Sequence, residues 1–309
     1  MAQIHHADQP GRAAAVSRAV LLVLLGMGII GFIDNFIVVI AETASLWQFN
    51  FLRAAMSLPV LAGVIWLGWG QFWPKRPFWV FLRTLAFVAS MFLYFGALGF
   101  VSIGQALAGL FTAPLFVLVL GALFLGQPFR PLQAVAVVMG FSGVLMVLQP
   151  ATLLDPRLVL PVSGGVLYAI NGLITRIYCS KEDTLGLLTF YNIGMCLCGA
   201  LGVLYFYGSP NDPGAEGYLT RGWGQTPPVF WALMCLQAAG ALVAVWCLTR
   251  AYQLAPTGVV SVSEYSVMIF GPLFAALLFG DVPNALALFG LAVIIGAGVW
   301  MTRLEIRAT

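Results

Sequence analysis

The sequence predicts an all-α integral membrane protein with ten transmembrane helices, and three observations lead to that fold class. Of the 309 residues, 61% are hydrophobic and only 8% are charged, whereas a typical water-soluble domain has about 25% charged residues. Ten apolar segments have the length of about 20 residues that a helix needs to cross the hydrocarbon core. Short segments rich in proline, glycine and charge separate these ten segments.

The predicted helices follow one another along almost the whole chain. The first is interpreted as a retained helix and not as a cleaved signal, because its apolar run is too long and contains Asp34 and Asn35. The stretch at about 208–227, which contains Pro210, Pro213 and mixed charge, is predicted to be solvated coil. The ten helices are expected at residues 18–40, 46–68, 78–99, 104–125, 131–149, 158–178, 186–207, 228–250, 257–279 and 283–302.

The positive charges predict which ends of the helices face the cytoplasm. With the N-terminus placed there, eleven of the fourteen Lys and Arg residues fall on the cytoplasmic side. Only Arg157 and Arg221 fall outside, and Arg53 lies within a helix. This asymmetry requires an even number of spans, so both termini are predicted to be cytoplasmic and the membrane to be a cell inner membrane.

The two halves of the chain resemble each other weakly. The stretch from Gly104 to Gln127 has the same glycine spacing as the stretch from Gly258 to Asp281. Two further correspondences are Asn35 with Asn171, and Phe51-Leu52-Arg53 with Phe190-Tyr191-Asn192. Because five helices is an odd number, the second half would be inverted relative to the first, a common design of secondary transporters. We therefore expect a cytoplasmic tail at 1–17, a first repeat at 18–149 and an inverted second repeat at 158–303.

Over about residues 18–303 the chain resembles the drug/metabolite transporter superfamily, and within it the ten-helix EamA-type carriers. The motifs that carry the resemblance are Ile33-Asp34-Asn35, Phe51-Leu52-Arg53-Ala54, Ala113-Pro114-Leu115-Phe116 to Leu125-Gly126-Gln127, and Glu264-Tyr265-Ser266 to Phe279-Gly280-Asp281. Family members often have glutamate where this chain has Gln127 and Asp281. The resemblance implies a substrate cavity between the halves. It also implies transport of amino acids, their derivatives or amphiphilic cations, and Glu-Tyr-Ser is most similar to the branch with S-adenosylmethionine carriers.

Glu264 and Asp34 are the main candidates for substrate binding or coupling, because a charge inside a membrane is costly. Glu264 lies about a third of the way along its helix, in a turn that also contains Ser263 and Tyr265. Its carboxylate either binds a substrate amine, takes up a proton, or hydrogen-bonds to neighbouring helices. Asp34, past the middle of the first helix, is a second cavity carboxylate, a proton site or half of an ion pair.

Basic, amide and aromatic groups complete the predicted site. Arg53 either snorkels to the interface, holds a substrate carboxylate, or pairs with Asp34, which is the interpretation we favour. Arg83, Arg176 and Arg250 lie near helix ends and are interpreted as snorkelling. The predicted substrate-binding or coupling residues are Glu264, Asp34, Tyr265, Asn35, Asn171, Arg53, Gln105, Tyr94 and Ser263. The alternative for Asn35 and Asn171 is hydrogen bonding between helices.

The sequence thus predicts a secondary transporter that moves an amino acid, an amino-acid derivative or an organic cation by alternating access, with or without proton coupling. The alternatives are an exporter of drugs or quaternary cations with the same fold, a channel, and an intramembrane enzyme. An enzyme is least supported, because the two histidines, His5 and His6, lie in the tail. We expect no cofactor, metal or nucleic-acid partner, a surrounding lipid bilayer, and a monomer or homodimer.

Overall fold

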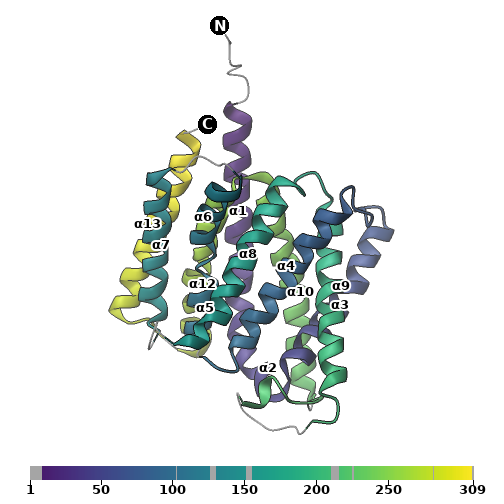
Figure 1. Ribbon diagram of the computed structural model, residues 1–309. Helices are drawn as coiled ribbons and strands as arrows, with labels where there is room; N and C mark the ends of the chain where they lie inside the picture. The colour runs from purple at the N-terminus through teal and green to yellow at the C-terminus, as the bar shows by residue number, and fades with distance from the viewer. Residues whose placement is uncertain are drawn as a thin grey trace.

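The computed structural model describes residues 9–101, 103–125, 130–150, 155–209, 216–224, 226–280 and 282–307. Within these ranges every regular element is an α-helix or a short 3-10 turn, and together they form a single bundle (Figure 1). Ten helical spans are long and apolar enough to cross a membrane. The prediction of ten membrane-spanning helices is therefore confirmed.

The spans follow the predicted order, and three of them are interrupted. The first consists of α1 (Gln9–Ile33), η1 (Asp34–Phe36) and α2 (Ile37–Thr43). The others are α3 (Leu46–Trp66), α4 (Pro77–Ala97), α5 (Ile103–Leu110) with α6 (Ala113–Leu125), α7 (Pro131–Leu148), η2 (Pro156–Leu158) with α8 (Val159–Ile177), α9 (Thr184–Tyr205), α10 (Pro228–Leu254), α11 (Thr257–Ser263) with η4 (Glu264–Ser266) and α12 (Val267–Phe279), and α13 (Ala285–Arg307).

Local sequence explains where several helices begin. Proline occupies the first turn of α4, α7 and α10, where its missing N–H is not needed. The Ser45 hydroxyl accepts a hydrogen bond from the Gln48 N–H at the start of α3, and the Asp183 carboxylate caps α9 in the same way. These caps place the helix starts within a few residues of the predicted ones.

Polar side chains donate hydrogen bonds to the backbone carbonyls around the interruption in the first span. Asn35 Nδ2 donates to the Gly31 carbonyl at 2.6 Å, and Gln237 Nε2 of α10 donates to the Ile33 carbonyl at 2.7 Å. Inside a membrane, irregular backbone persists only where the protein itself supplies such partners. These hydrogen bonds therefore stabilise the turn that carries Asp34.

The most extensive helix packing joins four pairs: α7 with α13, α3 with α9, α1 with α10, and α4 with α8. In span numbers these are fifth with tenth, second with seventh, first with eighth, and third with sixth. Figure 1 shows the first pair at one edge of the bundle and the second pair at the opposite edge. The set of pairs is unchanged when every span is exchanged with the one five places away.

The first turns of α1 and the last turns of α13 lie at the same end of the bundle, called here the terminal end, and η3 (Glu216–Tyr218) lies at the far end (Figure 1). The prediction of a solvated coil near 208–227 is wrong for the described part of this loop. Tyr218 is buried, and the Leu219 carbonyl accepts a hydrogen bond from Trp47 Nε1 at 2.8 Å. This segment packs against the bundle because it brings its own aromatic and arginine side chains.

Candidate functional site

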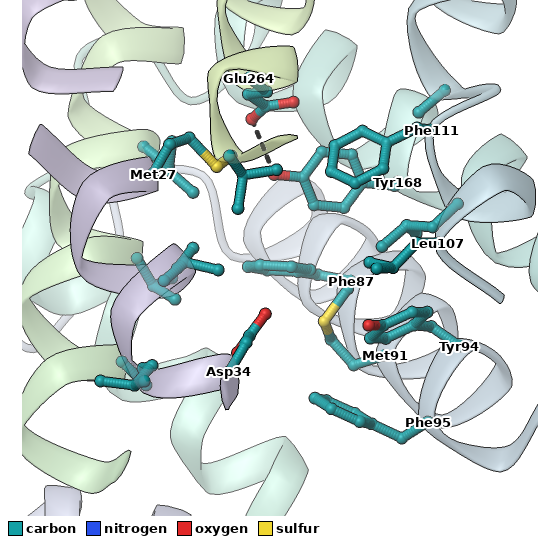
Figure 2. Close-up of a pocket in the computed structure, with 18 of the residues that line it drawn as sticks. Met27, Asp34, Phe87, Met91, Tyr94, Phe95, Leu107, Phe111, Tyr168 and Glu264 are labelled. Carbon is teal, nitrogen blue, oxygen red and sulfur yellow. Dashed lines mark hydrogen bonds between the residues drawn. The ribbon is translucent and has the colours of Figure 1, made fainter. Parts of the chain in front are cut away.

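A central cavity of about 110 Å³ lies between side chains of the first four spans and the sixth to ninth spans. Its wall is mainly aromatic and aliphatic, and its charged groups are Asp34, Arg53 and Glu264. Figure 2 shows Glu264 and Asp34 on either side of the Phe87 ring. The residues around the cavity include Met27, Phe87, Met91, Tyr94, Phe95, Leu107, Phe111, Tyr168, Tyr191 and Leu248.

Glu264 is held by two tyrosines that the sequence prediction did not include. Its side chain is only 2% exposed. Its Oε1 accepts a hydrogen bond from the Tyr168 hydroxyl at 2.8 Å, and its Oε2 accepts one from the Tyr252 hydroxyl at 3.1 Å. Tyr168 lines the cavity beside Glu264, whereas Tyr252 does not line it. The two phenols therefore fix the carboxylate from two helices, α8 and α10.

Glycine at position 172 makes room for the Tyr252 ring. A Cβ atom there would lie 2.7 Å from Cε1 of Tyr252. Small residues at such points let a large side chain or a neighbouring backbone approach closely in membrane bundles. The Tyr252–Glu264 hydrogen bond thus depends on the absence of a side chain on α8.

Asp34 and Arg53 both line the cavity but are not joined by a direct ion pair. In the part of the chain that the structure describes, no oxygen of Asp34 lies within 4.0 Å of a nitrogen of Arg53, although the arginine is near enough to act on the carboxyl electrostatically. Arg53 Nη2 donates to Asn50 Oδ1 at 3.2 Å, and its guanidinium lies 5.0 Å and 5.2 Å from the ring centres of Phe49 and Phe95. Arg53 is therefore held by the two aromatic rings and not by an ion pair with Asp34.

A second space of about 950 Å³, called here the far-end groove, continues from the cavity. The cavity and the groove share three lining residues, Asp34, Leu107 and Val267. The groove extends between the outer part of the first span and α12 as far as Phe279 and Asn284. The cavity therefore opens past Asp34 toward the far end, while Glu264 lies on its terminal-end side.

Comparison with known proteins finds relatives of this chain among membrane transporters. Residues 17–149 match the EamA-like transporter family. A riboflavin transporter of Rhizobium johnstonii is 27% identical over 86% of this chain and 82% of its own length. An S-adenosylmethionine uptake transporter of Rickettsia bellii is 24% identical over 82% of this chain and 81% of its own length. The family match and these relatives indicate the drug/metabolite transporter superfamily. Together with the ten helical spans, they support a multi-pass plasma-membrane protein that transports small molecules.

One solved crystal structure shares the fold of this transporter. It superposes with a TM-score of 0.75, covers 95% of this chain and 99% of its own, and is 16% identical in sequence. At that identity the likeness concerns the helix arrangement alone.

The transporter brings four of the nine predicted site residues to the cavity: Glu264, Asp34, Arg53 and Tyr94. Among the remaining five, Tyr265 is fully buried and donates to the Phe111 carbonyl at 3.2 Å. Ser263 donates to the Val259 carbonyl and lines a different groove, and Asn35 lines the far-end groove. Asn171 and Gln105 are buried away from the cavity lining.

The interpretation of Arg83 as a snorkelling residue is wrong. Its side chain is 1% exposed, and it donates to Thr175 Oγ1, the Leu187 carbonyl and Thr249 Oγ1, each at 3.1 Å. These acceptors lie on three other helices, so they draw the guanidinium into the bundle and not toward the membrane surface.

Several predictions fall on residues outside the described ranges. They concern Gln127 and Asp281 of the glycine motifs, and His5 and His6 of the tail. Among the residues that were described, no three His, Cys, Asp or Glu side chains come together in an arrangement that could hold a metal ion.

Proposed function

We propose that this protein is a secondary transporter that moves a small cationic or zwitterionic metabolite through its central cavity by alternating access. The observation that carries the proposal is the pair of carboxylates, Glu264 and Asp34, in one aromatic cavity inside the membrane. Carboxylates at that depth are expensive unless they meet a substrate, an ion or a proton. Aromatic rings around them favour a cation or a flat ring system.

Alternating access is supported by the unequal ends of the cavity. Its far end continues into the far-end groove past Asp34, whereas on its terminal-end side the buried Glu264 is hydrogen-bonded to Tyr168 and Tyr252. A carrier requires a second state in which these ends exchange their accessibility. With the basic residues concentrated at the terminal end, we place that end in the cytoplasm.

The inverted repeat of two five-helix halves is supported by packing and by the broken helices. The four main helix pairs are preserved on exchanging spans five places apart. The breaks in the fourth and ninth spans occur at corresponding positions, near Phe111 and Tyr265, and these two residues touch through the Tyr265 hydroxyl. Discontinuous helices at the interface of two repeats are typical of transporters in which one repeat rocks against the other.

The two carboxylates would act at different stages. Asp34, at the open end, is the first carboxylate that a substrate ammonium meets on leaving the far-end groove. At Glu264, on the terminal-end side, an ammonium group or a proton neutralises the carboxylate before the cavity closes at the far end and opens at the terminal end. The volume of about 110 Å³ is small for a whole metabolite, because benzene alone occupies an engineered cavity of about 150 Å³. The lining helices must therefore move apart around a whole substrate.

The substrate class that fits these charges is an amino-acid derivative or an organic cation. Arg53 lines the same cavity as the two carboxylates and supplies a partner for a substrate carboxylate. A sulfonium amino acid with an attached ring, the chemistry of S-adenosylmethionine, satisfies all of these groups. A quaternary-cation exporter would use the same carboxylates and aromatic rings but would leave Arg53 without a partner.

The test is counterflow in proteoliposomes with amino acids, S-adenosylmethionine, riboflavin and quaternary amines. Glu264→Gln and Asp34→Asn are compared with Glu42→Gln, a matched control at an exposed carboxylate. We expect saturable exchange that both cavity variants lose and the control keeps. Equal exchange in all variants would place the site elsewhere. Preference for a dicarboxylate or phosphate ester would contradict the charge argument, and unsaturable flux without counterflow would identify a channel.

A further inference from the structure

Arg83 lies just beyond the cavity on its terminal-end side. It lies on α4 one turn nearer the terminal end than Phe87, the first α4 residue of the cavity lining. Its acceptors lie correspondingly nearer that end on their own helices: Leu187 is one turn before Tyr191 on α9, and Thr249 directly follows Leu248 on α10. The guanidinium thus joins four helices in a layer just beyond the cavity.

The acceptors of Arg83 are all uncharged. Two are threonine hydroxyls and one is a backbone carbonyl, and no carboxylate lies within 4.0 Å of it among the described residues. Its guanidinium also lies 5.5 Å from the ring centre of Phe87. A buried charge is costly when it is held this way, and stable folds usually pair it. A cation that only neutral groups hold is suited to a contact that must open.

We propose that Arg83 is the latch that closes the terminal end of the cavity, an inference that rests on the alternating access proposed above. Opening that end separates α4 from α8, α9 and α10, and breaks the three hydrogen bonds of the guanidinium together. Water then solvates the released cation and offsets most of the lost bonds. No carboxylate is left behind unpaired, so the closed and open states remain close in energy, as a carrier requires.

A native cysteine reports on this layer. The Cys179 side chain is fully buried and packs in one cluster with Val80, Ile174 and Leu187, whose carbonyl accepts from Arg83. Opening of the latch would expose the thiol to water. Burial raises the pKa of the Cys179 thiol to about 11, and the positive charge of Arg83 acts in the opposite direction. Removing Arg83 would therefore slow thiol modification if nothing moved.

The experiment uses the full chain in nanodiscs, with Cys179 as the single cysteine and the other four, at positions 196, 198, 235 and 247, replaced by alanine. The rate of modification by a charged, water-soluble thiol reagent is measured with and without Arg83→Gln. We expect the variant to react at least about tenfold faster, equivalent to about 1.4 kcal/mol. Thr249→Val, which removes one acceptor at similar volume, should accelerate the reaction less. Arg303→Gln, at an exposed arginine of α13, is the matched control and should change nothing.

A second reporter separates opening from loosening of the fold. Ala275 of α12 lines the far-end groove, so Ala275→Cys in a chain without other cysteines measures access from that side. We expect Arg83→Gln to slow its modification while that of Cys179 accelerates. Acceleration at both positions would show a loosened bundle and overturn the latch, as would unchanged Cys179 rates in both Arg83→Gln and Thr249→Val. Neither reporter requires a substrate, so failure of the transport proposal would show separately, in counterflow.

Discussion

Replacing Gly172 by alanine tests whether Glu264 works through its tyrosines. The new Cβ would lie 2.7 Å from the Tyr252 ring, and restoring an ordinary contact of 3.4 Å requires a shift of about 0.7 Å. The Tyr252 hydroxyl lies 3.1 Å from Glu264 Oε2. A shift of that size along the bond takes the two oxygens beyond hydrogen-bonding distance. A hydrogen bond to a charged group contributes about 1.5–3 kcal/mol, which is roughly a 10-fold to 150-fold change in affinity.

The assay is the concentration dependence of counterflow for whichever substrate the panel identifies. We expect Gly172→Ala and Tyr252→Phe each to raise the half-saturating concentration by at least about tenfold. Because both remove the same hydrogen bond, the double variant should be no worse than the more severe single one. Gly63→Ala is the control, since a Cβ at that position meets nothing within 4 Å. Normal affinity in Gly172→Ala beside impaired Tyr252→Phe, or additive losses in the double variant, would refute the reasoning.

Three further predictions follow from single contacts. Gly143→Ala would place a Cβ 2.8 Å from a backbone carbonyl of α13, so we expect the stability of the fold to fall by about 1–3 kcal/mol. The loss is measured as a lower melting temperature by intrinsic fluorescence, and Gly296→Ala is the control that should not change it. Arg53→Lys removes the planar guanidinium that lies 5.2 Å from the Phe95 ring centre. The free energy of substrate binding should therefore weaken by about 0.5–2 kcal/mol in the counterflow assay, and equal affinity would exclude Arg53 from the site. Because the pKa of Cys179 is about 11, its thiolate fraction, and hence its modification rate by mass spectrometry, should rise about tenfold per pH unit from pH 7 to 9; a plateau near pH 8 would contradict burial of this thiol.

The ten spans could be predicted because length and apolarity are local properties of the sequence. Each predicted segment overlaps one observed span. The interruption of the first span at Asp34 was not predicted, because it depends on Gln237, which donates from a helix about 200 residues further along the chain. Partners of this kind exist only after the helices have packed.

The site was predictable only in part for a similar reason. The cost of burying charge identified Glu264 and Asp34 from their sequence positions alone. Tyr265 and Ser263 were then included because they are the sequence neighbours of Glu264. Successive residues point about 100° apart in an α-helix and about 120° apart in a 3-10 turn, so when Glu264 faces the cavity its two neighbours face other helices. Tyr168 and Tyr252 were missed because nothing local distinguishes a tyrosine that meets a carboxylate from one that anchors at the interface.

The proposed inverted repeat would relate the scaffold of the two halves but not their charges. In the alignment that matches Asn35 with Asn171, the counterpart of Asp34 is Ile170, and in the alignment of Gly104 with Gly258, the counterpart of Glu264 is Leu110. Exchanging the two halves therefore moves the helices to equivalent positions but leaves each carboxylate without an equivalent. The two access states need not have equal energies when the site is empty, because Asp34 and Glu264 are solvated differently in each. A bound cation or proton that neutralises both carboxylates removes this difference, and that is a physical reason for the empty and loaded carrier to change sides at different rates.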